Sequence, residues 1–132
     1  MTSHRLAGSR VLIVEDEFFL ADDARTILSG EGAEILGPVA TVNEARAVIE
    51  REPRIDGVLL DVNLRGEKAF EFADALQSRG IPFAFVTGYD VEMLPERFAD
   101  VTSVAKPVRP DQLINVFGAL VASASEKPVG TT

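Results

Sequence analysis

The chain has 132 residues with 13 Lys or Arg against 21 Asp or Glu, a formal net charge of −8. That length suits about one domain, and the absence of cysteine together with a single histidine, His4, excludes disulfides, cysteine nucleophiles, Ser-His-Asp relays and multi-histidine zinc sites. The negative charge also argues against nucleic acid as a partner, because binding a phosphate backbone needs clustered Lys and Arg.

Apolar runs predict the strands of one sheet. They cover residues 11–14, 35–39, 58–60, 81–86 and 101–105. Continuous apolar runs of this length are typical of strands buried on both faces, as in a parallel sheet. Pro38 cannot donate a hydrogen bond to a neighbouring strand, so we expect the second strand at an edge of the sheet.

Helical patterns separate these strands. Apolar side chains recur at helical spacing within residues 20–28, 42–49, 69–76 and 113–121. Thr41 and Glu44 have the spacing of a capping box at the start of the second helix, and Pro110 suits the first turn of the last helix. Pro95 interrupts residues 91–99, which we expect to be weakly helical. We expect these aromatic side chains in the core: Phe18, Phe19, Phe70, Phe72 and Phe117.

The alternation of strand and helix predicts a parallel sheet with right-handed crossovers and helices on both faces. We expect an N-terminal tail at residues 1–9, one domain at residues 10–122 and a disordered tail at residues 123–132. The N-terminus lacks the apolar core of a secretory signal, and the longest uncharged stretch, residues 112–125, is too short and too polar for a membrane span. We therefore expect a cytoplasmic protein without membrane contact.

Polar side chains follow four of the predicted strands. Glu15 and Asp16 follow the first strand, Asp61 the third, Thr87 the fourth and Lys106 the fifth. In open α/β sheets the site lies beyond the carboxyl ends of the strands. We therefore expect these side chains to meet at one edge.

This set suits phosphoryl chemistry. Neighbouring carboxylates repel one another, and Mg²⁺, which prefers oxygen ligands, would relieve that repulsion. Asp61 is a candidate nucleophile toward phosphorus. The Lys106 ammonium and the Thr87 hydroxyl would stabilise charge on the transferring oxygens. The bond between Lys106 and Pro107 is a candidate cis peptide.

Four motifs together resemble the receiver domains of two-component response regulators. They are VLIVEDE at residues 11–17, VLLDVNL at 58–64, VTG at 86–88 and AKP at 105–107. The resemblance covers roughly residues 10–122. It implies a flavodoxin-like, CheY-like three-layer α/β/α fold whose five-stranded parallel sheet has the order 2-1-3-4-5.

The resemblance also implies roles for individual residues. Asp61 matches the phosphoacceptor, which takes its phosphoryl group from a phosphohistidine on a sensor histidine kinase. Asp16 matches a direct Mg²⁺ ligand, and Glu15 matches its neighbour that acts through metal-bound water. Asn63 matches the position whose main-chain carbonyl binds the metal. Thr87 matches the switch hydroxyl and Lys106 the family's lysine. Such a domain catalyses only its own phosphorylation and dephosphorylation.

The chain departs from the common pattern near its last strand. Ser103 stands where receivers usually carry an aromatic switch residue, and Val108 stands where Phe is frequent. The segment PFAFVTGY at residues 82–89 resembles instead the signature of the FAT GUY receiver subgroup, whose partners are often kinases of the HWE type. Our hypothesis is that Tyr89 replaces the missing aromatic.

The sequence therefore predicts a single-domain response regulator that signals through protein–protein contact or acts as a phosphate sink or shuttle. One alternative is an aspartyl-nucleophile phosphatase similar to haloacid dehalogenases, although Asn63 stands where their second Asp would lie and a cap domain is absent. The other alternative is a pseudo-receiver that binds partners without phosphorylation, against which the complete residue set argues.

Overall fold

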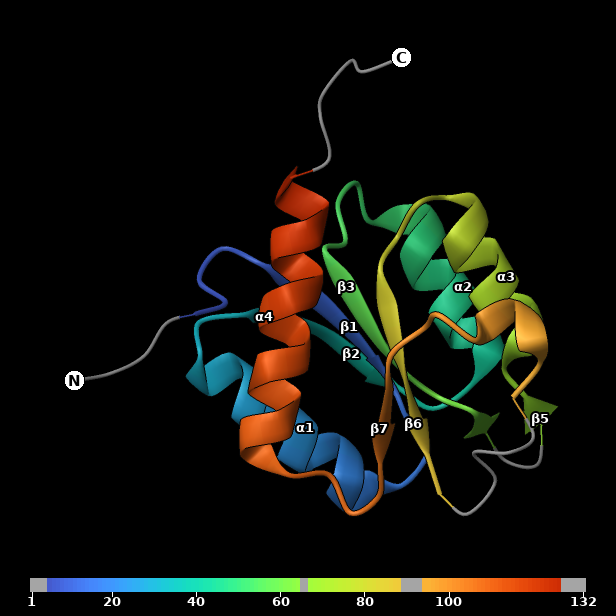
Figure 1. Ribbon diagram of the computed structural model, residues 1–132, viewed down its shortest axis with the longest axis horizontal. Helices are drawn as coiled ribbons and strands as arrows, with labels where there is room; N and C mark the ends of the chain where they lie inside the picture. The colour runs from blue at the N-terminus through green and yellow to red at the C-terminus, as the bar shows by residue number, and fades with distance from the viewer. Residues whose placement is uncertain (1–4, 65–66, 89–93, 127–132) are drawn as a thin grey trace.

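The computed structural model describes residues 5–64, 67–88 and 94–126. The elements, labelled in Figure 1 except for β4 and η2, are β1 (Arg10–Val14), α1 (Phe18–Gly30), β2 (Glu34–Val39), α2 (Val42–Arg51), β3 (Gly57–Asp61), β4 (Asn63–Leu64), β5 (Glu67–Lys68), α3 (Phe70–Ser78), β6 (Phe83–Thr87), the 3₁₀ turn η2 (Glu96–Phe98), β7 (Ser103–Ala105) and α4 (Pro110–Glu126). Five strands form one parallel sheet in the order β2-β1-β3-β6-β7. The predicted sheet and strand order are confirmed, and β2, which carries Pro38, lies at an edge.

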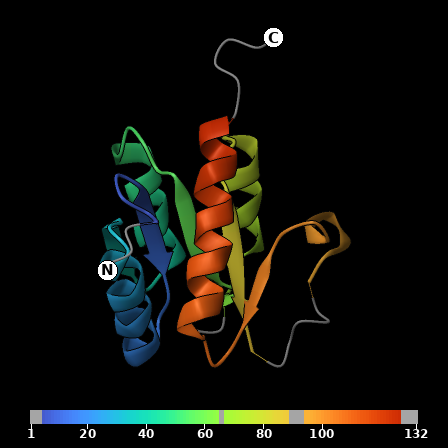
Figure 2. The ribbon, with the colours of Figure 1, turned by 60° about the vertical axis from the view of Figure 1, so that its left-hand side comes forward.

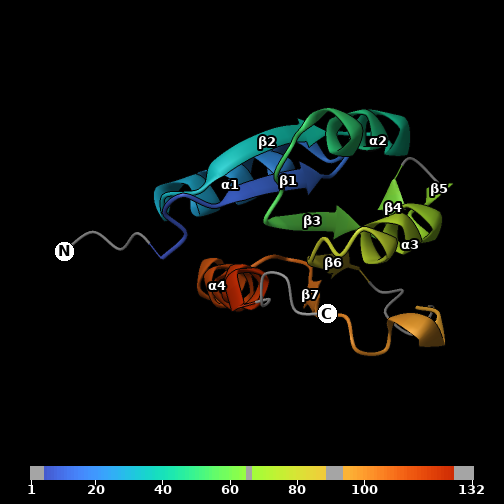
Figure 3. The ribbon, with the colours of Figure 1, turned by 90° about the horizontal axis from the view of Figure 1, so that it is seen from above.

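Helices cover both faces of the sheet and make three layers. Seen from above, α1 and α4 lie on one side and α2 and α3 on the other (Figure 3). Figure 2 shows the same arrangement with α4 in front of the strands and α2 and α3 behind them. Each face has its own apolar core: Leu28 and Phe117 belong to the first, Phe72 and Phe98 to the second.

The strands carry the apolar runs because they are buried on both faces. Every residue of β3 and β6 is buried. Alternate residues of one strand enter the two cores: Leu59 packs with α1 and α4, whereas Leu60 packs with α2 and α3. A core on each side stabilises the sheet by apolar burial at roughly 25 cal/mol per Å².

A capping box starts α2. The Oγ1 atom of Thr41 accepts a hydrogen bond from the backbone N–H of Glu44 at 3.1 Å. The Glu44 carboxylate accepts in return from the backbone N–H of Ala40 at 3.1 Å, one residue before the cap. The predicted box is therefore present, with its return bond shifted by one residue.

Phe18 and Phe19 correct one expectation. Their exposed fractions are 72% and 81%, and their rings contact each other edge to face. They occupy the first turn of α1, ahead of the residues Ala21, Ala24 and Leu28 through which the helix is buried. Phe72 and Phe117 are fully buried, as predicted.

The predicted tails also differ from the structure at their inner ends. Leu6 is fully buried and belongs to the core that α1 and α4 cover, although it falls in the expected N-terminal tail. Helix α4 runs to Glu126, four residues past the expected domain end, because residues 122–126 contain no Gly or Pro and include Ala, the best helix former. The remaining tail residues, 127–132, lie outside the described residues.

Two local features complete the fold. The short strands β4 and β5 form an antiparallel pair after β3, which the sequence did not predict. Pro95 precedes η2, so the expected weak helix is a short 3₁₀ turn within the described part of residues 91–99.

None of the described helices is long and apolar enough to cross a membrane.

Candidate functional site

The carboxyl ends of four strands bring the predicted side chains to one edge of the sheet. Asp61 is the last residue of β3 and lies beside Val86 in the register, next to Thr87 at the end of β6. Thr87 pairs in turn with Ala105 of β7, which precedes Lys106. A pocket of about 250 Å³ opens at this edge, and its walls include Asp16, Asn63, Gly88 and the three residues Asp61, Thr87 and Lys106.

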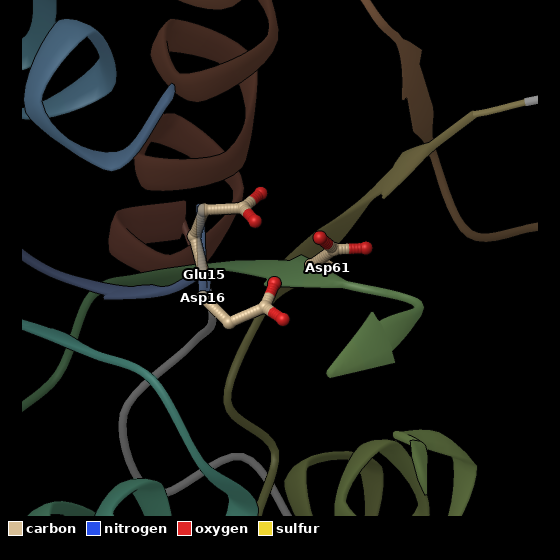
Figure 4. A group of neighbouring side chains, drawn as sticks. All are labelled: Glu15, Asp16 and Asp61. Atoms are coloured by element: carbon tan, nitrogen blue, oxygen red, sulfur yellow. The ribbon is translucent and has the colours of Figure 1, made fainter. Parts of the chain in front are cut away.

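Three acidic side chains gather at the ends of β1 and β3. Glu15, Asp16 and Asp61 each offer a carboxylate oxygen within 4.8 Å of the other two. Figure 4 shows Glu15 and Asp16 side by side at the end of β1 with their carboxyl groups close to that of Asp61. Glu15 and Asp61 are only 3% exposed, so water screens their mutual repulsion poorly.

Both carboxylate oxygens of Asp61 accept hydrogen bonds. Oδ1 accepts from the backbone N–H of Asn63 at 3.0 Å, and Oδ2 accepts from Nζ of Lys106 at 3.1 Å. The first bond arises because the chain turns from β3 into β4 directly after Asp61. Asp61 is therefore held in place in the lining of the pocket.

Lys106 brings a positive charge to this site. Its ammonium lies 3.1 Å from Asp61, 3.1 Å from Glu17 and 3.9 Å from Glu15. Burial lowers the pKa of Lys106, but the contacts with Asp61, Glu15 and Glu17 outweigh burial and raise this pKa above its usual value. The side chain is therefore positively charged at neutral pH. The backbone N–H of Lys106 donates to the carbonyl of Thr87 at 2.8 Å, and the Lys106–Pro107 peptide bond is cis.

Glu15 provides the test of whether a metal ion fits. Its Oε2 atom accepts from the backbone N–H of Glu17 at 3.0 Å. Its Oε1 atom is buried and has no hydrogen-bond partner among the described residues. Burial, followed by the neighbouring Asp61, raises the pKa of Glu15 to about 9. An orphaned oxygen among three carboxyl groups suits a hard divalent cation such as Mg²⁺, which takes oxygen ligands.

The structure brings together six residues that the sequence singled out: Glu15, Asp16, Asp61, Asn63, Thr87 and Lys106. Tyr89 lies outside the described residues. Sequence reasoning missed the contact between Glu17 and Lys106, which are separated by 89 positions. In the sequence, Glu17 has the pattern of an ordinary acidic residue at the start of a helix. No local pattern indicates a partner so distant in the chain.

Comparison with known families agrees with this geometry. A sequence model of the response regulator receiver domain matches residues 11–117. The chain belongs to this family. Receiver domains are signalling domains and not classical enzymes, and they interact in general with histidine kinases. They typically bind Mg²⁺ at an acidic cluster, and Glu15, Asp16 and Asp61 form such a group here.

Three known proteins match most of the chain. The solution structure of SdrG from Sphingomonas melonis Fr1 is 38% identical, with a TM-score of 0.76 over 86% of this chain and 96% of that one. A CheY-like receiver from Methanospirillum hungatei JF-1 is 26% identical, with a TM-score of 0.76 over 91% and 98% of the two chains. The phyllosphere-induced regulator PhyR of Methylorubrum extorquens is 30% identical over 106 residues, which is 78% of this chain but 40% of PhyR.

Proposed function

We propose that this receiver domain accepts a phosphoryl group on Asp61 from a phosphohistidine of a sensor histidine kinase. The observation that carries the proposal is that Asp61 belongs to an acidic cluster, accepts a hydrogen bond from the Lys106 ammonium and lines an open pocket. Glu15, Asp16, Asp61 and the main-chain carbonyl of Asn63 would hold Mg²⁺. The bound ion would neutralise negative charge among the carboxylates and the phosphoryl oxygens.

The chain's own groups account for the transfer. A carboxylate oxygen of Asp61 attacks phosphorus, the oxygen–phosphorus bond forms, and the nitrogen–phosphorus bond to the kinase histidine breaks, so that the imidazole leaves with the bonding electron pair. The Lys106 ammonium stabilises negative charge on the transferring oxygens. The Thr87 hydroxyl, buried at the neighbouring strand end, donates a hydrogen bond to one of those oxygens after transfer.

The output we propose is a change of protein contacts. Phosphorylation adds negative charge and acceptor oxygens. We expect the phosphoryl oxygens to attract the Thr87 hydroxyl and the Lys106 ammonium, which alters the surface around β6 and β7. The same chemistry also serves a phosphate sink or shuttle. A kinase of the HWE type and a switch role for Tyr89 follow from the FAT GUY resemblance and stay predictions, as does the cytoplasmic location.

Two other functions remain as outcomes of the test. A phosphatase of the aspartyl-nucleophile type needs a general acid two residues after Asp61, and the neutral Asn63 stands there. A pseudo-receiver needs no reactive site. The buried Asp61 with its paired Lys106 favours a domain that is phosphorylated over a pseudo-receiver.

The test is phosphorylation by acetyl phosphate in the presence of Mg²⁺, followed by intact mass. The wild-type protein should gain the mass of one phosphoryl group, and Asp61→Asn should gain none. Asp23→Asn, which removes an exposed carboxylate from α1, is the matched control and should behave as wild type. Continuous release of phosphate from many esters would support the phosphatase. An unmodified wild-type protein would overturn the proposal.

A further inference from the structure

Glu17 contacts Lys106 from the solvent side of the site. Lys106 Nζ lies 3.1 Å from Glu17 Oε2 and 3.1 Å from Asp61 Oδ2. The Glu17 side chain is 64% exposed, whereas that of Asp61 is 4% exposed. The ammonium is thus held between a buried carboxylate, which is the proposed phosphoacceptor, and an exposed carboxylate that has no assigned role.

The backbone fixes the position of Glu17. Its N–H donates to Glu15 Oε2 at 3.0 Å. Its carbonyl accepts from the N–H of Ala21 at 2.9 Å, which begins α1. Although Glu17 is the N-cap residue of α1, its side chain makes no capping hydrogen bond. The carboxylate is therefore not needed for the helix start, and its hydrogen bond to Lys106 is a separate interaction.

On phosphorylation, the contact between Glu17 and Lys106 would compete with a new contact between Lys106 and the phosphoryl oxygens. The lysine ammonium has three N–H donors, and in this arrangement it serves both Asp61 and Glu17. A phosphoryl group on Asp61 moves negative charge outward and needs Lys106 at its own oxygens. Glu17 opposes this in two ways, because it attracts the same ammonium and because its negative charge repels the incoming phosphoryl group.

We propose that Glu17 is a positioning residue: it holds Lys106 in the position that the lysine has before Asp61 is phosphorylated, and so slows phosphoryl transfer to Asp61. The inference rests on the proposed phosphoacceptor function and deepens it. It assigns to the first residue after the acidic pair a restraining role that acts through Lys106, whereas Glu15 and Asp16 serve the metal.

The kinetic test compares Glu17→Gln with Asp23→Asn. Both variants remove one negative charge from an exposed side chain and keep the side-chain size; Glu17 is the N-cap residue of α1 and Asp23 lies within the helix. The ion pair with Lys106 is lost only in the first. With acetyl phosphate and Mg²⁺, Glu17→Gln should raise the apparent second-order rate constant for adduct formation about two- to five-fold, the range expected for an exposed ion pair. Asp23→Asn should leave this rate constant unchanged. Equal rates in Glu17→Gln and wild type, or equal increases in both variants, would overturn the inference.

A spectroscopic test measures the contact itself. In the unphosphorylated protein, the ¹³Cε and ¹⁵Nζ resonances of Lys106 should move in Glu17→Gln and stay in place in Asp23→Asn. Unmoved resonances in Glu17→Gln would reject the contact. If the wild-type protein forms no Asp61 adduct, the proposed function fails and this inference fails with it. If the adduct forms normally and Glu17→Gln has no effect, the inference alone is rejected.

Discussion

Lys106 and Asp61 lie 3.1 Å apart although their strands are not neighbours in the sheet. Strand β6 separates β3 from β7, so the lysine side chain reaches across the end of β6, where Thr87 lies. One ion pair therefore spans three strand ends and places a positive charge beside the buried carboxylate. This relationship makes Lys106 the first residue to test.

Replacing Lys106 with Met should lower the rate of Asp61 phosphorylation by acetyl phosphate about ten-fold or more, because the charge on the transferring oxygens loses its cation. The measurement is a time course of intact mass with Mg²⁺ present. Arg51→Met is the matched control. Arg51 also carries one positive charge, and it ends α2, before the chain enters β3 at the end opposite to Asp61. An equal decrease in both variants would mean that net charge, and not the position of Lys106, sets the rate.

The raised pKa of Glu15 predicts a pH dependence of stability without metal. Folded Glu15 has a pKa of about 9 against an ordinary 4.5, so between these values the folded protein holds a proton that the unfolded chain has lost. The free energy of unfolding should therefore be highest at low pH in this window and fall as pH rises toward 9.

Urea unfolding in EDTA at several pH values measures this dependence. Glu15→Gln should flatten the slope, because the variant has no carboxyl group to titrate at this position. Added Mg²⁺ should reduce the loss of stability at high pH, since binding to the folded state alone is stabilising. A wild-type slope that persists unchanged in Glu15→Gln would assign the effect to other groups.

Removal of the Phe98 ring should be costly for stability. Its ring is 1% exposed and lies 5.3 Å from that of Phe85 and 5.9 Å from that of Phe70, measured between centroids. Phe98→Ala should lower the free energy of unfolding by about 3–5 kcal/mol through lost burial and a residual cavity. Phe18→Ala, which removes an exposed ring, should change it by less than about 0.5 kcal/mol. Similar losses in the two variants would contradict the packing described for Phe98.

The capping box of α2 predicts a smaller effect. Thr41→Ala removes the hydroxyl that accepts from the Glu44 N–H and should lower the free energy of unfolding by about 1 kcal/mol. Thr26→Ala is the control, because Thr26 is exposed within α1 and Ala is the better helix former there. The measurement is the urea midpoint at constant slope. A decrease in Thr26→Ala as large as in Thr41→Ala would count against the cap.

The sequence predicted the sheet and the site because each rests on a local pattern. The continuous apolar runs of β3 and β6 reflect burial on both faces, and each run stops where a polar side chain reaches the edge. Pro38 predicted the edge position of β2 from its missing donor alone. Asp61, Thr87 and Lys106 could be placed together since parallel strands end on the same side.

The features that escaped prediction lack a local pattern. Strands β4 and β5 have two residues each, too few to show a period. Phe18 and Phe19 are apolar, but the helix turn that carries them extends beyond the buried stripe of α1. The contact of Glu17 with Lys106 joins two ordinary surface charges, and it exists because the sheet brings β1 and β7 to a common edge.

The order of the strands has a consequence for how the protein reaches its native state. Each neighbouring pair in the parallel sheet is joined by a crossover, so none of these pairs can form as a local hairpin. The chain must lose the entropy of closing long loops before strand pairing stabilises the sheet, which favours slow folding for a domain of this size. The reactive groups extend from Glu15 to Lys106 along the chain. A nascent chain on the ribosome therefore cannot accept a phosphoryl group by this arrangement until Lys106 has emerged and β7 has docked.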